Sequence, residues 1–278
     1  MRDLDPPAGA VRAVVAAALV EDFGLLGDLT SLATIDAEAA ATGRFVVRID
    51  GVLAGSAAAT ETYRQLDPDV RLDWHAHDGD GVGAGTAIAT ITGPTRSVLG
   101  GERTALNFLQ HCSGIATLTR RFVDSAAGRS RIRDTRKTLP GLRALEKAAV
   151  RAGGGFNHRE SLSDAMLVKD NHLAGLDLKE AVERCKSMWP GRVVEVECDT
   201  LEQLTAAVEA GADLVLLDNM SPAQVREARR LAAGSVDLEV SGGVTLETVA
   251  DYAATGVQYI SLGAITHSAP ALDIGLDF

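Results

Sequence analysis

The sequence predicts an α/β protein whose second half forms a parallel sheet or an α/β barrel. From about residue 130 onward, apolar stretches of strand length alternate with stretches of helical periodicity, which is the order of a parallel sheet. Aromatic residues make up only 4% of the 278 residues, and aliphatic contacts suit strands covered by helices. Hydrophobic residues make up 46%, so the chain can bury a sizeable core.

The first hundred residues have a different rhythm. The apolar stretch 11–20 is interrupted by Arg12 and has no basic region before it, so we expect an amphipathic helix and neither a signal peptide nor a membrane span. A long helix is expected over 97–126, with Gly114 as a candidate break. Turns rich in Asp, Gly and Pro separate the strands expected over 44–49, 70–76 and 86–92.

The second half contains six expected strands. Alternating apolar and charged positions predict helices in most of the gaps, for example over 201–210 and 222–233. Six strands are two fewer than a complete eightfold barrel has, so either strands are missed or the barrel is incomplete. The six lie over 130–135, 165–169, 193–198, 214–218, 237–241 and 259–262.

Each of these strands ends in a charged residue or a glycine turn. The carboxyl ends of barrel strands open into one shared site, so we expect these groups to lie together. One charged residue at a strand end is usually an ordinary loop residue, but six such ends favour a functional site. The strand-end residues are Arg136, Lys137, Lys169 to His172, Glu197, Asp218, Asn219, Ser241 to Gly243, Gly263 and Ala264.

Glycines follow the last two strands and also precede a basic tripeptide. Gly242, Gly243 and Gly263 allow a ligand close to the backbone, and barrels commonly bind phosphate with the loops after their last strands. A third run, 153–155, precedes Asn-His-Arg at 157–159 and favours an anion-facing loop. It lacks the spacing of a dinucleotide fingerprint or a P-loop.

The chain is acidic overall, but one stretch is basic. Its 27 Lys and Arg against 38 Asp and Glu give a net charge of −11, which argues against a nucleic-acid partner because phosphate neutralisation needs a basic face. Residues 129–159 nevertheless hold nine basic and two acidic residues, which predicts a local site for a small anion. Within this stretch Arg143, Lys147 and Arg151 are expected to form a solvated helix face.

The three cysteines, Cys112, Cys185 and Cys198, show no CxxC spacing and cannot all pair. Each lies in a stretch that resembles a helix or a strand. We therefore expect reduced, structural thiols in a soluble cytoplasmic protein.

A series of short motifs runs in order along the chain: ERTALN (102–107), SGIAT (113–117), DTRKT (134–138), PGLR (140–143), AGGG (152–155), NHR (157–159), KDNH (169–172), LDNMSP (217–222), SGGVT (241–245), GA (263–264) and THSAP (266–270). Together they resemble the quinolinate phosphoribosyltransferases, also called nicotinate-nucleotide pyrophosphorylases (carboxylating). The resemblance runs from about residue 21 to the C-terminus. Three residues depart from the family pattern, and none of them removes a charged group: Leu139 stands where Thr is usual, Ser161 where Gly is usual and Val240 where Ala is usual.

The resemblance implies a two-domain fold. An N-terminal α/β sandwich over 1–110, completed by about 268–278, is followed by an open seven-stranded α/β barrel over 111–267. It also implies the enzyme's reaction, which joins quinolinate to phosphoribosyl pyrophosphate and gives nicotinate mononucleotide, CO₂ and pyrophosphate in NAD biosynthesis. Mg²⁺ is the implied cofactor. A homodimer or higher even oligomer with shared active sites is implied as well, and no membrane or nucleic-acid partner.

The resemblance further implies the site residues. Arg side chains bind carboxylates through two hydrogen bonds, which suits the two adjacent carboxylates of quinolinate. The implied quinolinate-binding residues are Arg103 of the partner subunit, Thr135, Arg136, Lys137, His158, Arg159 and Lys169. The implied catalytic residues are Lys137, Lys169, Glu197 and Asp218, of which the two carboxylates would hold the metal directly or through water. The phosphoribosyl and phosphate groups would be bound by Glu197, Asp218, Ser241, Gly242, Gly243, Gly263 and Ala264.

Three other functions remain open at this point. A related phosphoribosyltransferase could take a monocarboxylate such as nicotinate, although the dense basic cluster argues against it. A barrel aldolase could form a Schiff base on Lys137 or Lys169. A catalytically silent paralogue could bind anions as a regulator, but the presence of both Glu197 and Asp218 makes this less attractive.

Overall fold

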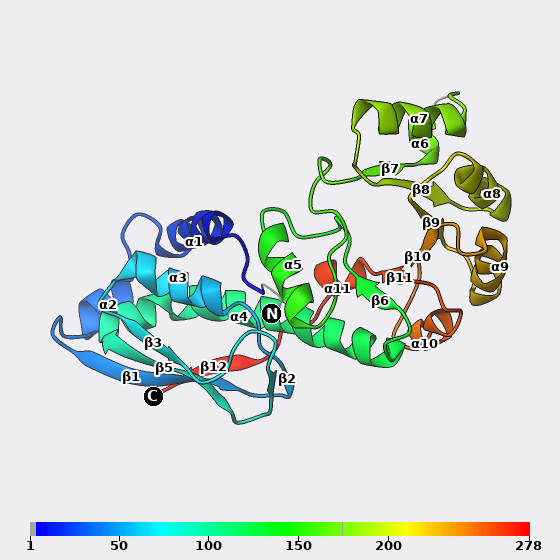
Figure 1. Ribbon diagram of the computed structural model, residues 1–278. Helices are drawn as coiled ribbons and strands as arrows, with labels where there is room; N and C mark the ends of the chain where they lie inside the picture. The colour runs from blue at the N-terminus through cyan, green and yellow to red at the C-terminus, as the bar shows by residue number, and fades with distance from the viewer. Residues whose placement is uncertain (1–3, 174) are drawn as a thin grey trace. The chain divides into compact units, whose positions relative to one another are not determined.

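The computed structural model describes residues 4–173 and 175–278 (Figure 1). The chain divides into two compact units. The first contains the residues up to Arg120, residues 138–154 and the residues from Ala264 onward; the second contains residues 121–137 and 155–263. The boundary expected at residue 110 falls inside one long helix, α4 (Thr95–Ala126), which begins in the first unit and ends in the second.

The first unit is built on a four-stranded antiparallel sheet in the order β12-β1-β5-β3. Its strands are β1 (Ala40–Val47), β3 (Arg71–Trp74), β5 (Ala87–Pro94) and β12 (Ile274–Asp277). The last strand of the chain therefore pairs with the first one. A second, two-stranded sheet is made by β2 (Gly51–Val52) and β4 (Gly81–Val82).

Buried side chains from the four-stranded sheet and from α3 form the core of the first unit. Phe45, Ile88 and Ile91 from the strands and Tyr63 from α3 belong to one hydrophobic cluster. The expected helix over 11–20 lies within α1, which buries Val11 and Val15. The helices that begin in this unit are α1 (Ala8–Phe23), α2 (Leu29–Thr34), α3 (Ser56–Leu66), α4, α5 (Arg143–Ala152) and α11 (Ala264–His267).

Helix α5 corrects one prediction from the sequence. Arg143, Lys147 and Arg151 were expected on a solvated helix face, but Lys147 is fully buried and the other two are half-buried. Next to it, the buried Glu146 carboxylate lies 2.9 Å from Nε2 of His111. The prediction was wrong because α5 is covered by the rest of its unit, and helical spacing of charges does not reveal how much of a helix is covered.

The second unit is built on a six-stranded parallel sheet in the order β6-β11-β10-β9-β8-β7. All six strands expected from the sequence are present, with ends within two residues. They are β6 (Arg131–Arg133), β7 (Met166–Val168), β8 (Val194–Cys198), β9 (Leu214–Asp218), β10 (Asp237–Ser241) and β11 (Tyr259–Ser261). Figure 1 shows these strands following a curved path with α7, α8 and α9 on its outer side.

In place of a seventh strand, the described residues hold a single parallel bridge between Phe156 and Arg133 of β6. The Phe156 N–H donates to Ile132 O at 2.8 Å, and the Asp134 N–H donates to Phe156 O at 3.2 Å. The segment that carries Asn157, His158 and Arg159 is thereby fixed beside β6, at the opposite edge of the sheet from β7.

Side-chain caps define where several helices of this unit begin. Thr200 and Gln203 form a capping box at α8, and Ser221 and Gln224 form another at α9. These caps end the turns that follow β8 and β9. The helices of this unit are α6 (Asp170–Leu173), α7 (Leu178–Met188), α8 (Leu201–Glu209), α9 (Pro222–Ala232) and α10 (Val249–Ala253). Over the residues that the structure describes, no helix has both the length and the apolar character needed to cross a membrane.

Candidate active site

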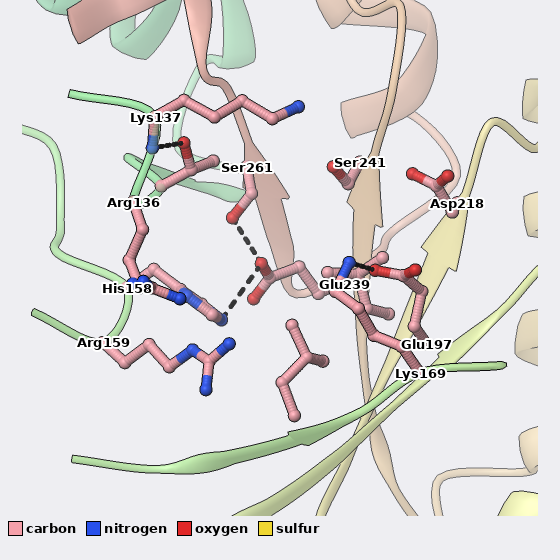
Figure 2. A pocket seen from close by; sticks show the side chains of 13 residues that line it. Arg136, Lys137, His158, Arg159, Lys169, Glu197, Asp218, Glu239, Ser241 and Ser261 are labelled. Atoms are coloured by element: carbon pink, nitrogen blue, oxygen red, sulfur yellow. Dashed lines mark hydrogen bonds and ion pairs between the residues drawn. The ribbon is translucent and has the colours of Figure 1, made fainter. Parts of the chain in front are cut away.

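A cavity of about 300 Å³ opens at the carboxyl ends of the parallel strands, and we call it the strand-end pocket (Figure 2). All of its lining residues belong to the second unit. They are Thr135, Arg136, Lys137, His158, Arg159, Leu167, Lys169, Glu197, Leu216, Asp218, Glu239, Ser241 and Ser261. Nine of the fourteen site residues expected from the sequence are in this set.

The other five expected residues lie elsewhere. Arg103 is on α4 in the first unit, where it lines a different cavity together with Asp22 and Asp28. The two glycines Gly242 and Gly243 have φ angles of 92° and 64° and form the turn directly after Ser241. Gly263 follows β11 by two residues, and Ala264 begins α11.

The basic side of the pocket is formed by Arg136, His158 and Arg159, which approach it from one direction in Figure 2. Arg159 Nη1 donates to Ala165 O at 3.1 Å, which fixes the guanidinium. Burial and the nearby charge of Arg136 lower the pKa of Arg159. The buried Nε of Arg136 has no hydrogen-bond partner among the described residues. The two guanidinium groups repel each other, so an anion bound between them would be favoured.

The backbone of the His158 segment is held by Asp134, which is fully buried. One carboxylate oxygen of Asp134 accepts the His158 N–H at 2.9 Å, and the other accepts Asn157 Nδ2 at 2.6 Å. Asp134 directly precedes Thr135, Arg136 and Lys137. A single carboxylate thus ties the two loops that carry the basic residues to each other.

Two buried glutamates lie beneath the pocket. His158 Nε2 is 2.7 Å from a Glu195 oxygen and 3.7 Å from a Glu239 oxygen. Glu239 also accepts Arg133 Nη1 at 2.5 Å and the Ser261 hydroxyl. Burial alone would lower the pKa of His158, but the hydrogen bond to Glu195 and the charge of Glu239 outweigh it, and the pKa of His158 is raised. The contacts with the two glutamates therefore favour the protonated imidazole.

These two glutamates and Arg133 are not among the site residues predicted from the sequence, although a pattern in the strands could have indicated the glutamates. Glu195 precedes Glu197 by two residues on β8, and Glu239 precedes Ser241 by two on β10. Side chains two apart in a strand point to the same face, so both glutamates face the same interior as the expected site residues.

On the acidic side of the pocket, Lys169 forms an ion pair with Glu197. Asp218 lies beyond Glu197 at the end of β9. Burial and the charges of Glu197 and Asp199 raise the pKa of Asp218, and Lys169 and Lys137 offset this only in part. The two carboxylates therefore repel each other, and a cation or a developing positive charge between them would be favoured.

Oxygen and nitrogen atoms that could bind a metal occur in two places. His158, Glu195 and Glu239 offer atoms within 4.8 Å of one another, but His158 already pairs with Glu195 and Arg133 with Glu239. Glu197 and Asp218 offer carboxylate oxygens that line the pocket, which are the ligands that Mg²⁺ prefers. The second place fits a hydrated Mg²⁺ better than the first.

The three departures from the family pattern lie close to this pocket in sequence. Val240 is fully buried in β10, and Leu139 donates its N–H to Glu146 at 3.2 Å. Ser161 binds Asp164 through its N–H at 3.0 Å and its hydroxyl at 3.1 Å. Val240 and Ser161 are thus accommodated by local packing and local hydrogen bonds, whereas Leu139 is exposed.

The family models for quinolinate phosphoribosyl transferase match almost the whole chain, the N-terminal domain over residues 28–113 and the C-terminal domain over residues 115–277. A protein of Bacillus subtilis named probable nicotinate-nucleotide pyrophosphorylase [carboxylating] is 44% identical over 93% of this chain and 90% of its own length. The nicotinate-nucleotide pyrophosphorylase [carboxylating] of Mycobacterium leprae is also 44% identical, over 96% of this chain and 97% of its own.

Solved structures agree with these matches. The nicotinate-nucleotide pyrophosphorylase of Francisella tularensis superposes with a TM-score of 0.94 at 38% identity and covers 100% of this chain and 99% of its own. Human nicotinic acid phosphoribosyltransferase reaches a TM-score of 0.58 at 16% identity over 96% of this chain and 73% of its own, which is a likeness of fold alone.

Proposed function

The chain belongs to the quinolinate phosphoribosyltransferase family, and we propose that the strand-end pocket is where it carries out that family's reaction. It is a nicotinate-nucleotide pyrophosphorylase (carboxylating), a pentosyltransferase of NAD biosynthesis. It transfers the phosphoribosyl group of phosphoribosyl pyrophosphate to quinolinate, releasing pyrophosphate and CO₂. One observation carries the assignment of the pocket: a cationic wall of Arg136, His158 and Arg159 faces the carboxylates of Glu197 and Asp218 across one cavity.

The cationic wall suits the two adjacent carboxylates of quinolinate. Arg136 and Arg159 line the pocket, and each would bind a carboxylate through two hydrogen bonds. The His158 imidazolium would add positive charge to this wall. Thr135, Lys137 and Lys169 also line the pocket. Binding a dianion there also relieves the repulsion between Arg136 and Arg159.

The acidic side suits the ribose. Attack of the pyridine nitrogen on ribose C1 passes through a state with positive charge on the ring while pyrophosphate leaves. Glu197 and Asp218 would stabilise this charge, since fixed carboxylates in a partly desolvated site interact with it more strongly than water does. A nearby positive charge would also offset the burial and repulsion that raise the pKa of Asp218. Lys137 and Lys169 would balance the charge of the departing pyrophosphate.

Mg²⁺ is part of this proposal, and its supporting observation is the electrostatic repulsion between Glu197 and Asp218. These two residues would hold the ion directly or through water, because Mg²⁺ usually keeps several waters and binds through one or two carboxylates and substrate phosphates. When bound, the ion supplies positive charge against the pyrophosphate group.

The 5′-phosphate of the ribose would lie at the glycine turns. Ser241, Gly242 and Gly243 follow β10, and Gly263 and Ala264 follow β11, which neighbours β10 in the sheet. The left-handed φ angles of Gly242 and Gly243 bend the backbone sharply, so that its N–H groups can face an anion.

Decarboxylation needs little further chemistry from the protein. Once the nitrogen is alkylated, its positive charge stabilises the electron pair left on C2 when CO₂ departs, and C2 then takes up a proton from the solvent to give nicotinate mononucleotide. The residues around the 2-carboxylate would hold that group away from water until it leaves.

We further propose a homodimer, or a higher even oligomer, in which Arg103 of the partner subunit completes the quinolinate site. In its own chain Arg103 belongs to the first unit, whereas the other basic residues expected to bind quinolinate belong to the second. A two-fold dimer can place such a residue over its neighbour's site. A cytoplasmic location is also proposed, which the free thiols of Cys112, Cys185 and Cys198 support.

One assay tests the function. The purified protein is given quinolinate, phosphoribosyl pyrophosphate and Mg²⁺, and nicotinate mononucleotide and CO₂ are measured. We expect both products in equal amounts, and no turnover when nicotinate replaces quinolinate. Turnover with nicotinate alone would favour a monocarboxylate transferase. Borohydride trapping of a substrate carbonyl on Lys169 would favour an aldolase, which the ion pair of Lys169 with Glu197 argues against.

A further inference from the structure

Asn219 has a backbone conformation that is unusual for its residue type. Its φ angle is 55°, in the left-handed region that residues other than glycine rarely adopt, although Asn tolerates it better than most. The backbone N–H of Asn219 continues the ladder between β9 and β10, where it donates to Ser241 O at 2.9 Å. Asp218 and Ser241 are register partners of β9 and β10, so Asn219 links the ends of two strands of the pocket.

The side chain of Asn219 contacts both of these strand ends. Its Nδ2 donates to Asp218 Oδ2 at 2.7 Å, which orients that carboxylate. On the other strand, a Cβ atom added to Gly242 would overlap Asn219 Oδ1 and lie 2.7 Å from its Cγ. The amide therefore occupies the space directly against the turn that follows Ser241, and only a glycine at residue 242 leaves room for it.

Helix capping does not account for Asn219. The helix that follows, α9, begins at Pro222, and its N-cap is Ser221, whose side chain accepts the Gln224 N–H in a complete capping box. Asn219 itself is exposed, so its side chain is not needed to satisfy a buried polar group. What its contacts have in common is that each one lies at the end of β9 or β10, where Asp218 and Ser241 line the strand-end pocket.

We propose that Asn219 is a positioning residue for phosphoribosyl transfer, which sets the spacing between the Asp218 carboxylate and the Ser241–Gly242–Gly243 turn. The inference rests on the proposed function, in which Asp218 acts on the ribose and the turn binds the 5′-phosphate of the same substrate. One substrate is thus held at two points, and Asn219 touches the protein at both. Displacing either point by about 1 Å is enough to cost on the order of 100-fold in rate.

Asn219→Gly separates the side chain from the backbone conformation, because glycine adopts a φ of 55° without strain but has no amide. We expect kcat/KM for phosphoribosyl pyrophosphate to fall by roughly 10- to 100-fold, while the dissociation constant of quinolinate, titrated without the second substrate, stays at the wild-type value. Thermal unfolding should stay close to wild type, since the residue is exposed. Wild-type kinetics in Asn219→Gly would overturn the proposal. So would a rise in the dissociation constant of quinolinate as large as the fall in kcat/KM for phosphoribosyl pyrophosphate.

Asn219→Asp provides the matched comparison. Aspartate keeps the shape and tolerates the left-handed conformation, but it cannot donate to Asp218 and adds a repelling charge. We expect a loss in kcat/KM for phosphoribosyl pyrophosphate at least as large as that of Asn219→Gly. A fully active Asn219→Asp enzyme would show that the hydrogen bond to Asp218 is irrelevant and would contradict the proposal.

A double-mutant cycle tests the contact with Gly242. Gly242→Ala introduces the Cβ atom, and its effect is measured in the wild type and in the Asn219→Gly variant. The strain of the φ of 92° at residue 242 is the same in both backgrounds and cancels. Removal of the Asn219 amide should therefore make Gly242→Ala less harmful to kcat/KM for phosphoribosyl pyrophosphate. An equal effect in both backgrounds would overturn the role of this contact.

The same experiments distinguish a failure of this inference from a failure of the proposed function. If the wild-type protein makes no nicotinate mononucleotide from quinolinate and phosphoribosyl pyrophosphate, the function itself is wrong. If the wild-type protein is active and Asn219→Gly is equally active, the function stands and only the positioning role of Asn219 is excluded.

Discussion

The Nε2 atom of His158 lies 2.7 Å from a carboxylate oxygen of Glu195, although the two residues come from distant parts of the second unit's sheet. His158 follows the bridge beside β6, and Glu195 is on β8, with β11, β10 and β9 between them in the strand order. Only a sheet curved into a barrel brings these two side chains together across its interior. The contact holds the imidazole in place and raises its pKa.

Glu195→Gln tests the role of this contact in binding. The pKa of His158 is raised from its ordinary value of about 6.5. The imidazole therefore stays protonated to a higher pH than an unperturbed histidine does. Quinolinate affinity should therefore weaken as the pH rises through this raised pKa. In Glu195→Gln the pKa falls, so the weakening should begin at lower pH. Quinolinate binding is measured by titration across pH 5.5 to 9, in steps of about 0.5 chosen to span the range in which His titrates.

Stability provides a second measurement on the same variant. A raised histidine pKa contributes stability that is fully present below the unfolded value and is lost as the pH rises through the folded one. The difference in Tm between wild type and Glu195→Gln should therefore shrink with rising pH. Glu180→Gln, which removes an exposed partner of Arg184 on α7, is the control and should leave both profiles unchanged. Identical profiles for Glu195→Gln and wild type would contradict the assignment.

Arg136→Ala tests the recognition of the two carboxylates. Removing one desolvated guanidinium should cost about 2–5 kcal/mol of quinolinate binding. The KM for phosphoribosyl pyrophosphate should change far less, because the acidic side of the pocket is intact. Steady-state kinetics with each substrate varied in turn measure the difference. Arg184→Ala, on the exposed face of α7, is the control. Equal effects of Arg136→Ala on both substrates would rule out the assignment.

Asp218→Asn should separate turnover from stability. The charge of Asp218 matters most as positive charge develops on the ribose, so turnover should fall by roughly 100-fold or more while quinolinate still binds. The folded protein, by contrast, should become more stable. A carboxyl group with a raised pKa contributes stability that is present below the unfolded pKa and is lost as the pH rises through the folded pKa.

We therefore expect Asp218→Asn to raise Tm at pH 7 and to have a smaller effect near pH 4, about the ordinary pKa of the group. Calorimetry at both pH values measures this. A variant with wild-type turnover would show that Asp218 is structural. A lower Tm at pH 7 would show that the repulsion between Asp218 and Glu197 does not destabilise the folded protein.

Mixing two inactive variants tests the shared site. If Arg103 acts on the partner's pocket, a hybrid of Arg103→Ala and Arg136→Ala subunits has one site with both lesions and one with neither. Random exchange makes half of the dimers hybrid, so roughly a quarter of the wild-type activity should return. Subunit exchange is verified by mass. An inactive mixture after complete exchange would show that Arg103 serves its own chain or no site at all.

The sequence alone was enough to predict the strands of the second unit and the residues at their ends. Lys169, Glu197, Asp218 and Ser241 each lie at or next to the end of a short, largely apolar strand, and parallel strands of one sheet carry their carboxyl ends to the same edge. The series of short motifs along the chain also indicated the family and therefore its reaction. These features are local, since they depend on the period of the chain and on residues adjacent in sequence.

Only the tertiary structure decided which charges are buried and which side chains meet across the barrel. Glu195 and Glu239 stand within apolar strands, and they are tolerated there because His158 and Arg133 reach them from other strands. Lys147 was expected in solvent and is buried. The charge state and environment of these groups depend on partners far away in sequence. Whether a charged side chain is solvated, paired or repelled is set by the fold around it, and a linear pattern does not contain that information.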